Sequence, residues 1–138
     1  MEALSVLIVE DEPDLLALFQ TVLKRSRRID TILTASGGEA AIRILKQEVP
    51  NLVILDLAMP HVSGNDVIRY ILSEPRLDKM LVMVVTAVPM RLSNESIPRV
   101  AMTLIKPVSP RNLEAGVMQL LTSPHLESLE SSTEEASR

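Results

Sequence analysis

The stretch NLVILDLAMPHVSG, residues 51–64, predicts a buried strand that ends at a carboxylate. It begins with an almost unbroken apolar run, residues 52–55, which is followed by Asp56 and then by the turn residues Ser63 and Gly64. Such a run, bounded by turn signals, is typical of a strand buried on both faces of a parallel sheet. In open parallel sheets, ligands bind beyond the carboxyl ends of the strands. We therefore expect chemistry at Asp56, although a lone Asp at a strand end is more often only a turn residue.

The composition indicates one domain with an aliphatic core. A chain of 138 residues is long enough to bury about 68–70% of its unfolded surface. Phe19 and Tyr70 are the only aromatic residues, so aliphatic side chains and methionine must fill the core. The absence of cysteine excludes disulfides and thiolate chemistry and fits a reducing compartment. The net charge of −4 argues against a direct nucleic-acid-binding surface.

The N-terminus predicts neither secretion nor membrane insertion. It lacks a basic region, and its apolar run stops at the acidic residues 10–12, which is unlike a signal peptide. No stretch approaches the roughly 18 apolar residues of a membrane span. We therefore expect a soluble, cytoplasmic domain that has no membrane partner.

Apolar runs alternate with helical patterns along the chain. Strands are expected at residues 4–9, 31–35, 52–55, 80–85 and 100–105, and helices at residues 13–26, 36–48, 65–73 and 110–121. This alternation predicts right-handed crossovers and a parallel sheet that is covered on both faces.

Several helix boundaries carry local signals. Ser36 and Glu39 have the spacing of a capping box, and Ser109 with Pro110 predicts the start of the last helix. The third helix should stop before Pro75. Its inward side chains are expected to be Val67, Ile68, Ile71 and Leu72.

The fourth crossover and the C-terminal end depart from this regular pattern. Residues 88–99 contain Pro89 and Pro98 and show little periodicity, so the fourth helix should be short or irregular. Residues 122–138 are rich in Ser and Glu. We expect them to form a flexible tail or linker after a domain that spans residues 1–121.

Polar residues follow four of the predicted strands at what should be the same edge of the sheet. They are Glu10, Asp11, Asp56, Thr86 and Lys106. Three carboxylates in one place would repel one another, which calls for a divalent cation such as Mg²⁺. Lys106 would supply a positive charge for a carboxylate or phosphoryl oxygen, and Thr86 would supply a hydroxyl donor. With no cysteine, no Ser–His pair and no Gly-rich loop, the chemistry that fits is attack by a carboxylate on a phosphoryl group.

Four motifs at these positions together resemble the receiver domain of bacterial two-component response regulators. They are VLIVEDEPDLL (residues 6–16), VILDLAMPHVSG (53–64), VVTA (84–87) and IKP (105–107). The resemblance covers about residues 4–121. It implies an α/β fold of the flavodoxin-like, CheY-like type, a doubly wound sheet of five parallel strands in the order 2-1-3-4-5.

The resemblance also implies a role for each residue of the predicted site. Asp56 is similar to the phosphoacceptor of the family, with Thr86 and Lys106 binding the phosphoryl oxygens. The Mg²⁺ ligands that it implies are Glu10, Asp11, Asp56 and the backbone carbonyl of Ala58. A cis peptide bond before Pro107 is implied as well.

These roles describe a signalling switch rather than a conventional enzyme. The resemblance implies a histidine kinase or a phosphotransfer protein as the phosphoryl donor, and a downstream protein target that the sequence does not identify. In such domains the face around the fourth helix often serves dimerisation or partner docking. The resemblance therefore also allows a homodimer. Thr103 departs from the family pattern, because an aromatic residue is usual at that position.

Other readings compete with the switch. A phosphorylation-independent adaptor with the same fold is the alternative that Thr103 and the irregular fourth helix favour. A phosphatase of the haloacid-dehalogenase type would need a second aspartate at position 58, which is Ala58. The basic cluster of residues 24–28 is interpreted as a solvated helix end, and His61 as a solvent-exposed loop residue.

Overall fold

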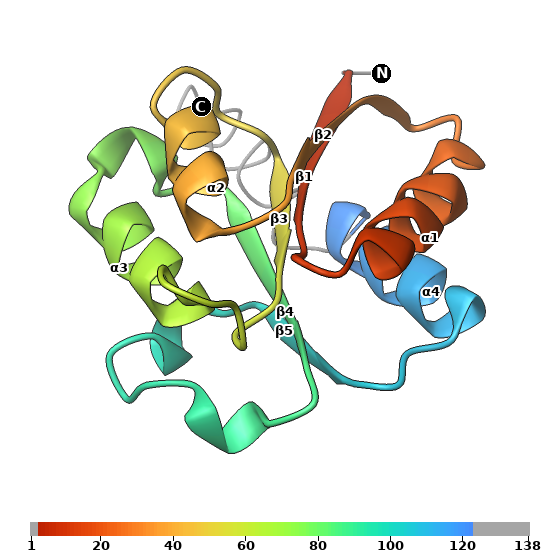
Figure 1. The fold of residues 1–138 in the computed structure, drawn as a ribbon. Helices are drawn as coiled ribbons and strands as arrows, with labels where there is room; N and C mark the ends of the chain where they lie inside the picture. Colours follow the sequence, from red (N-terminus) through yellow and green to blue (C-terminus); the bar gives the residue numbers. More distant parts are fainter. Residues whose placement is uncertain (1–2, 123–138) are drawn as a thin grey trace.

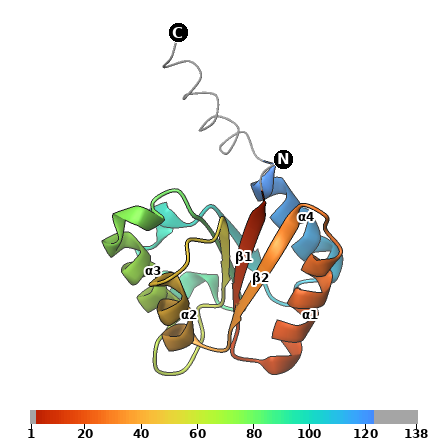
Figure 2. The ribbon, with the colours of Figure 1, turned by 90° about the horizontal axis from the view of Figure 1, so that it is seen from above.

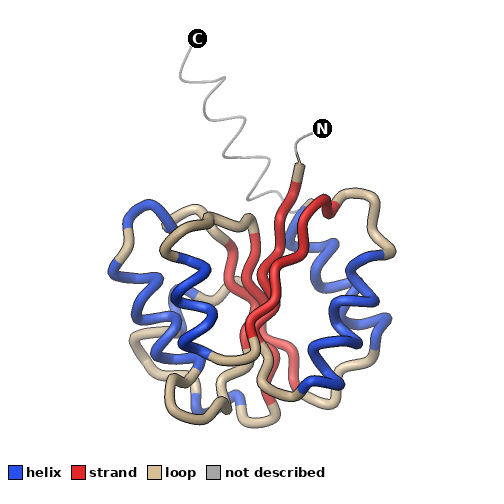
Figure 3. Tube along the Cα trace, turned by 45° about the horizontal axis from the view of Figure 1, so that its top comes forward, coloured by secondary structure: helices blue, strands red, loops and turns tan. Residues whose placement is uncertain are grey.

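The computed structural model describes residues 3–122, which form a five-stranded parallel sheet between two layers of helices (Figures 1 and 3). The strands are β1 (Leu4–Val9), β2 (Ile29–Ala35), β3 (Leu52–Leu55), β4 (Leu81–Thr86) and β5 (Met102–Ile105). The α-helices are α1 (Pro13–Lys24), α2 (Gly38–Leu45), α3 (Gly64–Ser73) and α4 (Pro110–Leu121). The strand order β2-β1-β3-β4-β5 confirms the predicted fold class. Residues 123–138, where a tail or linker is predicted, lie outside the described part of the chain.

Alternating side chains along the strands build two cores, one on each face of the sheet. Figure 2 shows α1 and α4 on one face and α2 and α3 on the other. Val6 and Ile8 of β1 face the first pair of helices, whereas Leu7 and Val9 face the second pair. The four apolar residues that α4 contributes to the first core, Leu113, Val117, Leu120 and Leu121, are the ones that its helical spacing predicts.

The register of the strands aligns their carboxyl ends. Val9 of β1 pairs with Leu55 of β3, so Glu10 and Asp56 leave the sheet side by side. On the other side of β3, Leu55 pairs with Val84 of β4, two residues before the strand ends. The polar residues that follow the strands therefore come to one edge, as the sequence predicts.

Two predictions about the helices are wrong. The N-cap of α2 is Gly37, with no side-chain hydrogen bond, so Ser36 and Glu39 do not form a capping box. The helix begins one residue too late for Ser36 to reach its first turn. Leu72 is 41% exposed instead of facing inward, because Val67, Ile68 and Ile71 already fill the strip of α3 that contacts the sheet.

The segment between β4 and β5, residues 87–101, contains no α-helix. It has two short 3₁₀ turns, Pro89–Arg91 and Ile97–Arg99, which agrees with the predicted irregular fourth helix. Because no helix lies there, one face of β5 stays open: Thr103 is exposed, and Ile105 is 60% exposed. The prediction of a sheet covered on both faces is therefore wrong at β5. Among residues 3–122, no helix has the length and apolar character that crossing a membrane requires.

Candidate functional site

The carboxylates predicted from the sequence lie together at the carboxyl edge of the sheet. Carboxylate oxygens of Glu10, Asp11 and Asp56 lie within 4.8 Å of one another. Glu10 and Asp56 are almost completely buried, with relative exposures of 1% and 5%, whereas Asp11 is partly exposed. Buried carboxylates are stable in a fold only when they are paired or bind a cation.

Lys106 pairs with both buried carboxylates. Its Nζ atom lies 2.8 Å from Oε1 of Glu10 and 3.3 Å from Oδ2 of Asp56. The lysine follows β5, two strands away from Asp56, and its backbone N–H donates to the carbonyl oxygen of Thr86. The extended end of β5 therefore delivers a positive charge to the middle of the site. The peptide bond between Lys106 and Pro107 is cis, as predicted.

The pKa values of the paired groups reflect burial and charge. Burial raises the pKa of the Glu10 carboxyl above its usual 4.5, and the hydrogen bond from Lys106 only partly offsets this effect. Burial would lower the pKa of Lys106, but the hydrogen bond and charge of Glu10, together with Asp56, raise it overall. The ammonium group is thus held in its charged form, while burial disfavours the charged form of Glu10.

Asp56 is also held by the backbone around it. Its Oδ1 atom accepts a hydrogen bond from the N–H of Ala58 at 3.3 Å. At Gly64, the first residue of α3, an added Cβ would collide with the carbonyl oxygen of Asp56 and lie 2.7 Å from the Cα atom of Leu57. Only a glycine therefore allows α3 to begin this close to the strand that carries Asp56.

Thr86 ends β4 at the same edge and is completely buried. Its Oγ1 atom accepts a hydrogen bond from the N–H of Val88 at 3.1 Å. A hydroxyl group that accepts one hydrogen bond still has its proton to donate to another group. His61 lies outside the cluster, exposed in the loop after Pro60 with a φ of 67°, which agrees with its interpretation as a loop residue.

The donor set suits a hard divalent cation. Three carboxylates face one ammonium group, which leaves an excess of two negative charges in a mostly buried site. All the ligand atoms are oxygens, which Mg²⁺ prefers, and the partly exposed Asp11 leaves a side from which a hydrated ion can enter. The residues present therefore fit Mg²⁺.

Sequence reasoning missed two elements beside the site. Ser63 and Asp66 form the capping box of α3: Asp66 N–H donates to the Ser63 hydroxyl at 3.3 Å, and Ser63 N–H donates to Asp66 Oδ2 at 2.9 Å. The S-x-x-D spacing is the signal that could have revealed it. The second element is a pocket of about 370 Å³ next to Lys106. No single sequence motif predicts it, because its apolar wall combines Phe19 of α1 with Val108, which follows β5 and is distant in the sequence.

The fold and this edge of the sheet define a receiver domain. The family model for the response regulator receiver domain matches residues 6–118. The chain belongs to this family, whose members act in two-component signalling.

Known relatives and solved structures agree with this assignment. "Polar-differentiation response regulator DivK" of Brucella ovis is 34% identical over 113 residues, which are 80% of this chain and 90% of that protein. "Probable transcriptional regulator ycf27" of Porphyridium aerugineum is 29% identical over 121 residues, or 88% of this chain, but the chain spans only 49% of that relative.

Among solved structures, the signal receiver domain of a Luxo repressor protein from Vibrio parahaemolyticus has a TM-score of 0.78 and 30% identity, covering 93% of this chain and 97% of that one. The response regulator TrrA of Thermotoga maritima, in complex with Mg²⁺ and BeF, has a TM-score of 0.73 and 28% identity. The match covers 85% of this chain and 98% of that one.

Proposed function

We propose that the protein is a phosphorylation-dependent switch of a two-component or phosphorelay system, and that Asp56 is its phosphoacceptor. The observation that carries this proposal is the placement of Lys106, whose ammonium group lies 3.3 Å from a buried Asp56 oxygen beside two further carboxylates. The TrrA relative, whose structure holds Mg²⁺ and BeF, supports the same assignment by analogy.

In the proposed reaction, an oxygen of the Asp56 carboxylate attacks the phosphorus atom of a phosphohistidine in a histidine kinase or a phosphotransfer protein. The P–N bond of the donor breaks with its electron pair left on the imidazole nitrogen, and a new O–P bond forms to Asp56. Lys106 pairs with a negative oxygen of the transferred group. The buried Thr86 hydroxyl donates a hydrogen bond to another oxygen of that group.

Mg²⁺ would be held by the oxygen ligands at the same edge. The ligands that we propose are the carboxylates of Glu10, Asp11 and Asp56 and the backbone carbonyl of Ala58. When bound, the ion would neutralise negative charge on the phosphoryl group during transfer. It would also stabilise the charged form of the buried Glu10 carboxyl, which burial disfavours.

The donor protein would approach over the pocket next to Lys106. This pocket brings the partly exposed apolar side chains of Leu15 and Val108 beside the site, so a donor could bury an apolar surface while its histidine reaches Asp56. A phosphorylation-independent adaptor is the second candidate. The open face of β5 at Thr103 and Ile105 favours it, because this face could bind a partner without any change at Asp56.

Intact mass after incubation with acetyl phosphate distinguishes the two functions. The switch predicts the gain of one phosphoryl group in the presence of Mg²⁺ and no gain when the metal is removed by a chelator. Asp56→Asn should gain none under either condition. No gain in folded wild-type protein with Mg²⁺ would favour the adaptor.

A further inference from the structure

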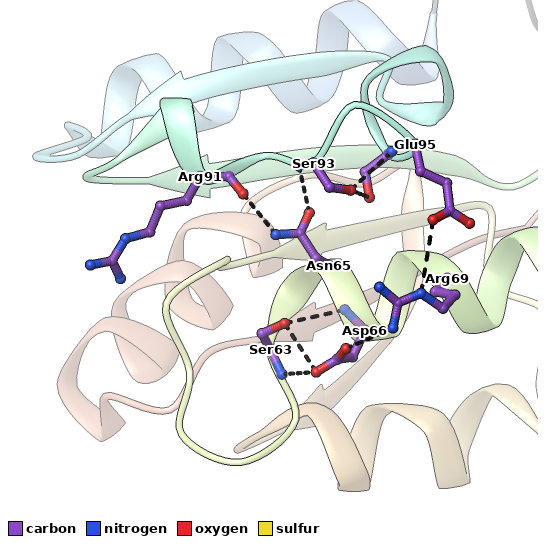
Figure 4. A network of polar contacts seen from close by, with 8 residues as sticks. Ser63, Asn65, Asp66, Arg69, Arg91, Ser93 and Glu95 are labelled. Atoms are coloured by element: carbon purple, nitrogen blue, oxygen red, sulfur yellow. Dashed lines mark hydrogen bonds and ion pairs between the residues drawn. The ribbon is translucent and has the colours of Figure 1, made fainter.

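The segment 88–100, which takes the place of the fourth helix, is fastened to the first turn of α3 by one side chain. The Nδ2 atom of Asn65 donates to the carbonyl oxygen of Arg91 at 2.8 Å, and its Oδ1 atom accepts from the N–H of Ser93 at 2.9 Å (Figure 4). We call these two hydrogen bonds the Asn65 clasp. They use both functions of the amide on two nearby backbone groups.

The α3 side of the clasp is fixed relative to the phosphoacceptor. Asn65 directly follows Gly64, whose N–H donates to the carbonyl oxygen of Leu57 at 3.1 Å and whose close approach to the Asp56 carbonyl leaves no room for a side chain. The capping box of Ser63 and Asp66 holds the same turn of helix (Figure 4). The clasp therefore binds the segment to a part of α3 that cannot move away from Asp56 without disturbing this contact.

The near end of the segment is tied to Thr86. The N–H of Val88 donates to Thr86 Oγ1 at 3.1 Å, and only residues 87–90 separate that threonine from Arg91. Pro89 and a 3₁₀ turn stiffen this short connection. A displacement at the Thr86 hydroxyl is therefore transmitted to the clasp instead of being absorbed by a flexible loop.

The far end of the segment is held more firmly than the clasp. The Nη2 atom of Arg99, which carries two protons, lies 2.8, 3.3 and 2.7 Å from the backbone carbonyl oxygens of Leu77, Asp78 and Met80. The two short contacts, to Leu77 and Met80, are hydrogen bonds from a charged donor, which are roughly twice as strong as the two neutral hydrogen bonds of the clasp. The ion pair that also joins the segment to α3, between Arg69 Nε and Glu95 Oε2, is 3.9 Å long and exposed, so it contributes little.

We propose that the Asn65 clasp is the regulated contact of this domain: it holds residues 91–93 while Asp56 is unmodified and opens when Asp56 carries a phosphoryl group. This inference rests on the proposed function. A phosphoryl group offers the Thr86 hydroxyl a charged acceptor, the hydroxyl moves toward it, and the connection through Val88 is displaced. The clasp opens because it is weaker than the Arg99 contacts at the far end, so that Arg99 stays bound and serves as the hinge.

Hydrogen exchange of the full chain, with and without beryllofluoride and Mg²⁺, tests the proposal. In wild-type protein, amides of residues 91–96 should exchange at least about fivefold faster when the phosphoryl mimic is bound. Exchange after Arg99 should not change. In Asn65→Ala the same amides should exchange fast in both states, so that the mimic changes their rate by less than about twofold.

Two further variants keep the outcome interpretable. Asn65→Asp keeps the acceptor for Ser93 and loses the donor to Arg91, so it should respond to an intermediate degree even if the alanine variant folds poorly. Arg69→Ala removes the exposed ion pair to Glu95 and should respond like wild type. A wild-type response in Asn65→Ala, or an unchanged wild-type segment, would overturn the clasp as the regulated contact.

Measuring the intact mass of the same samples distinguishes a wrong inference about the clasp from a wrong proposed function. If acetyl phosphate modifies Asp56 but exchange at residues 91–96 stays the same, only the inference about the clasp is wrong. If Asp56 takes up no phosphoryl group in folded protein, the proposed switch itself is wrong and the inference falls with it.

Discussion

Lys106 Nζ lies 3.3 Å from Oδ2 of Asp56, although 50 positions separate the two residues in the chain. The contact exists because β3 and β5 run parallel with β4 between them, so that both strands end at one edge of the sheet. Lys106 makes a shorter contact, 2.8 Å, with the more deeply buried Glu10. One ammonium group is thus the counter-charge of two buried carboxylates.

Replacing Lys106 by methionine should destabilise the protein and prevent phosphorylation. The change keeps most of the volume of the side chain but leaves Glu10 and Asp56 without a counter-charge, which costs about 3–5 kcal/mol for a buried pair. Urea unfolding at neutral pH measures the loss, and saturating Mg²⁺ should recover part of it. The exposed Lys79→Met is the matched control and should change stability by less than about 0.5 kcal/mol. Equal stability of Lys106→Met and wild type would contradict the role given to the ammonium group.

Mg²⁺ should raise the melting temperature of the wild-type protein, because it binds only the folded arrangement of the three carboxylates. At a hundred times its dissociation constant a ligand stabilises a protein by about 2.7 kcal/mol. Asp11→Asn should weaken Mg²⁺ binding by about tenfold or more, since Asp11 is in the cluster but outside the Lys106 pair. Isothermal titration provides the comparison, with the neighbouring exposed Glu12→Gln as control. Equal affinities of the two variants would exclude Asp11 as a ligand.

Gly64→Ala should disturb both stability and the site. The added methyl group meets backbone atoms of Asp56 and Leu57, which cannot rotate away, so we expect a loss of about 1–3 kcal/mol. At Gly37 an added Cβ has no atom within 4 Å, and Gly37→Ala should be close to neutral. Denaturant unfolding of the two variants checks this difference. A Gly64→Ala protein as stable as Gly37→Ala would show that α3 can shift away from Asp56 at little cost.

The capping box of α3 should give a pH-dependent contribution to stability. Hydrogen bonds from the backbone and hydroxyl of Ser63 lower the pKa of Asp66 below its usual 3.8. Because the pKa is lower in the folded state, the stabilisation is present above pH 3.8 and is lost as the pH falls through the lowered value. The destabilisation caused by Asp66→Asn should therefore be larger at neutral pH than in acid below that range. Unfolding curves at the two pH values measure it, and a difference independent of pH would contradict the assignment.

Ser63→Ala in the same box should cost about 0.5–2 kcal/mol. Ser36→Ala is the matched control, because Ser36 precedes the Gly37 N-cap and lies outside α2. We expect a change of less than about 0.5 kcal/mol for this variant. A larger loss at Ser36 than at Ser63 would contradict the helix boundaries described above.

The strand order and the gathered site follow from features that a sequence carries directly. Apolar runs such as residues 52–55 can be buried only inside the sheet, and two of the predicted site carboxylates, Glu10 and Asp56, directly follow such runs. Strand direction then places Glu10 and Asp56 at one edge. The apolar spacing of α4 predicts its core residues in a similar way, because apolar residues at helical spacing form a single face of the helix and only that face can pack against the sheet.

The features that the sequence did not predict depend on contacts between distant segments. At the start of α2, a Cβ on Gly38 would collide with the carbonyl oxygen of Val62, a contact with a distant segment that the local spacing around Ser36 does not encode. The bond between Asn65 and Arg91 joins residues 26 positions apart, across a segment with no regular pattern. The exposure of Leu72 likewise depends on how α3 is rotated against the sheet.

We expect Asp56, and not a neighbouring carboxylate, to accept the phosphoryl group. The most direct test is to phosphorylate the protein with acetyl phosphate and Mg²⁺, reduce it with borohydride, and map the peptides by mass spectrometry. An acyl phosphate is reduced to an alcohol, so we expect homoserine at position 56 and unchanged residues at positions 10 and 11. Reduction at Glu10 or Asp11, or no reduced residue in folded protein, would contradict it.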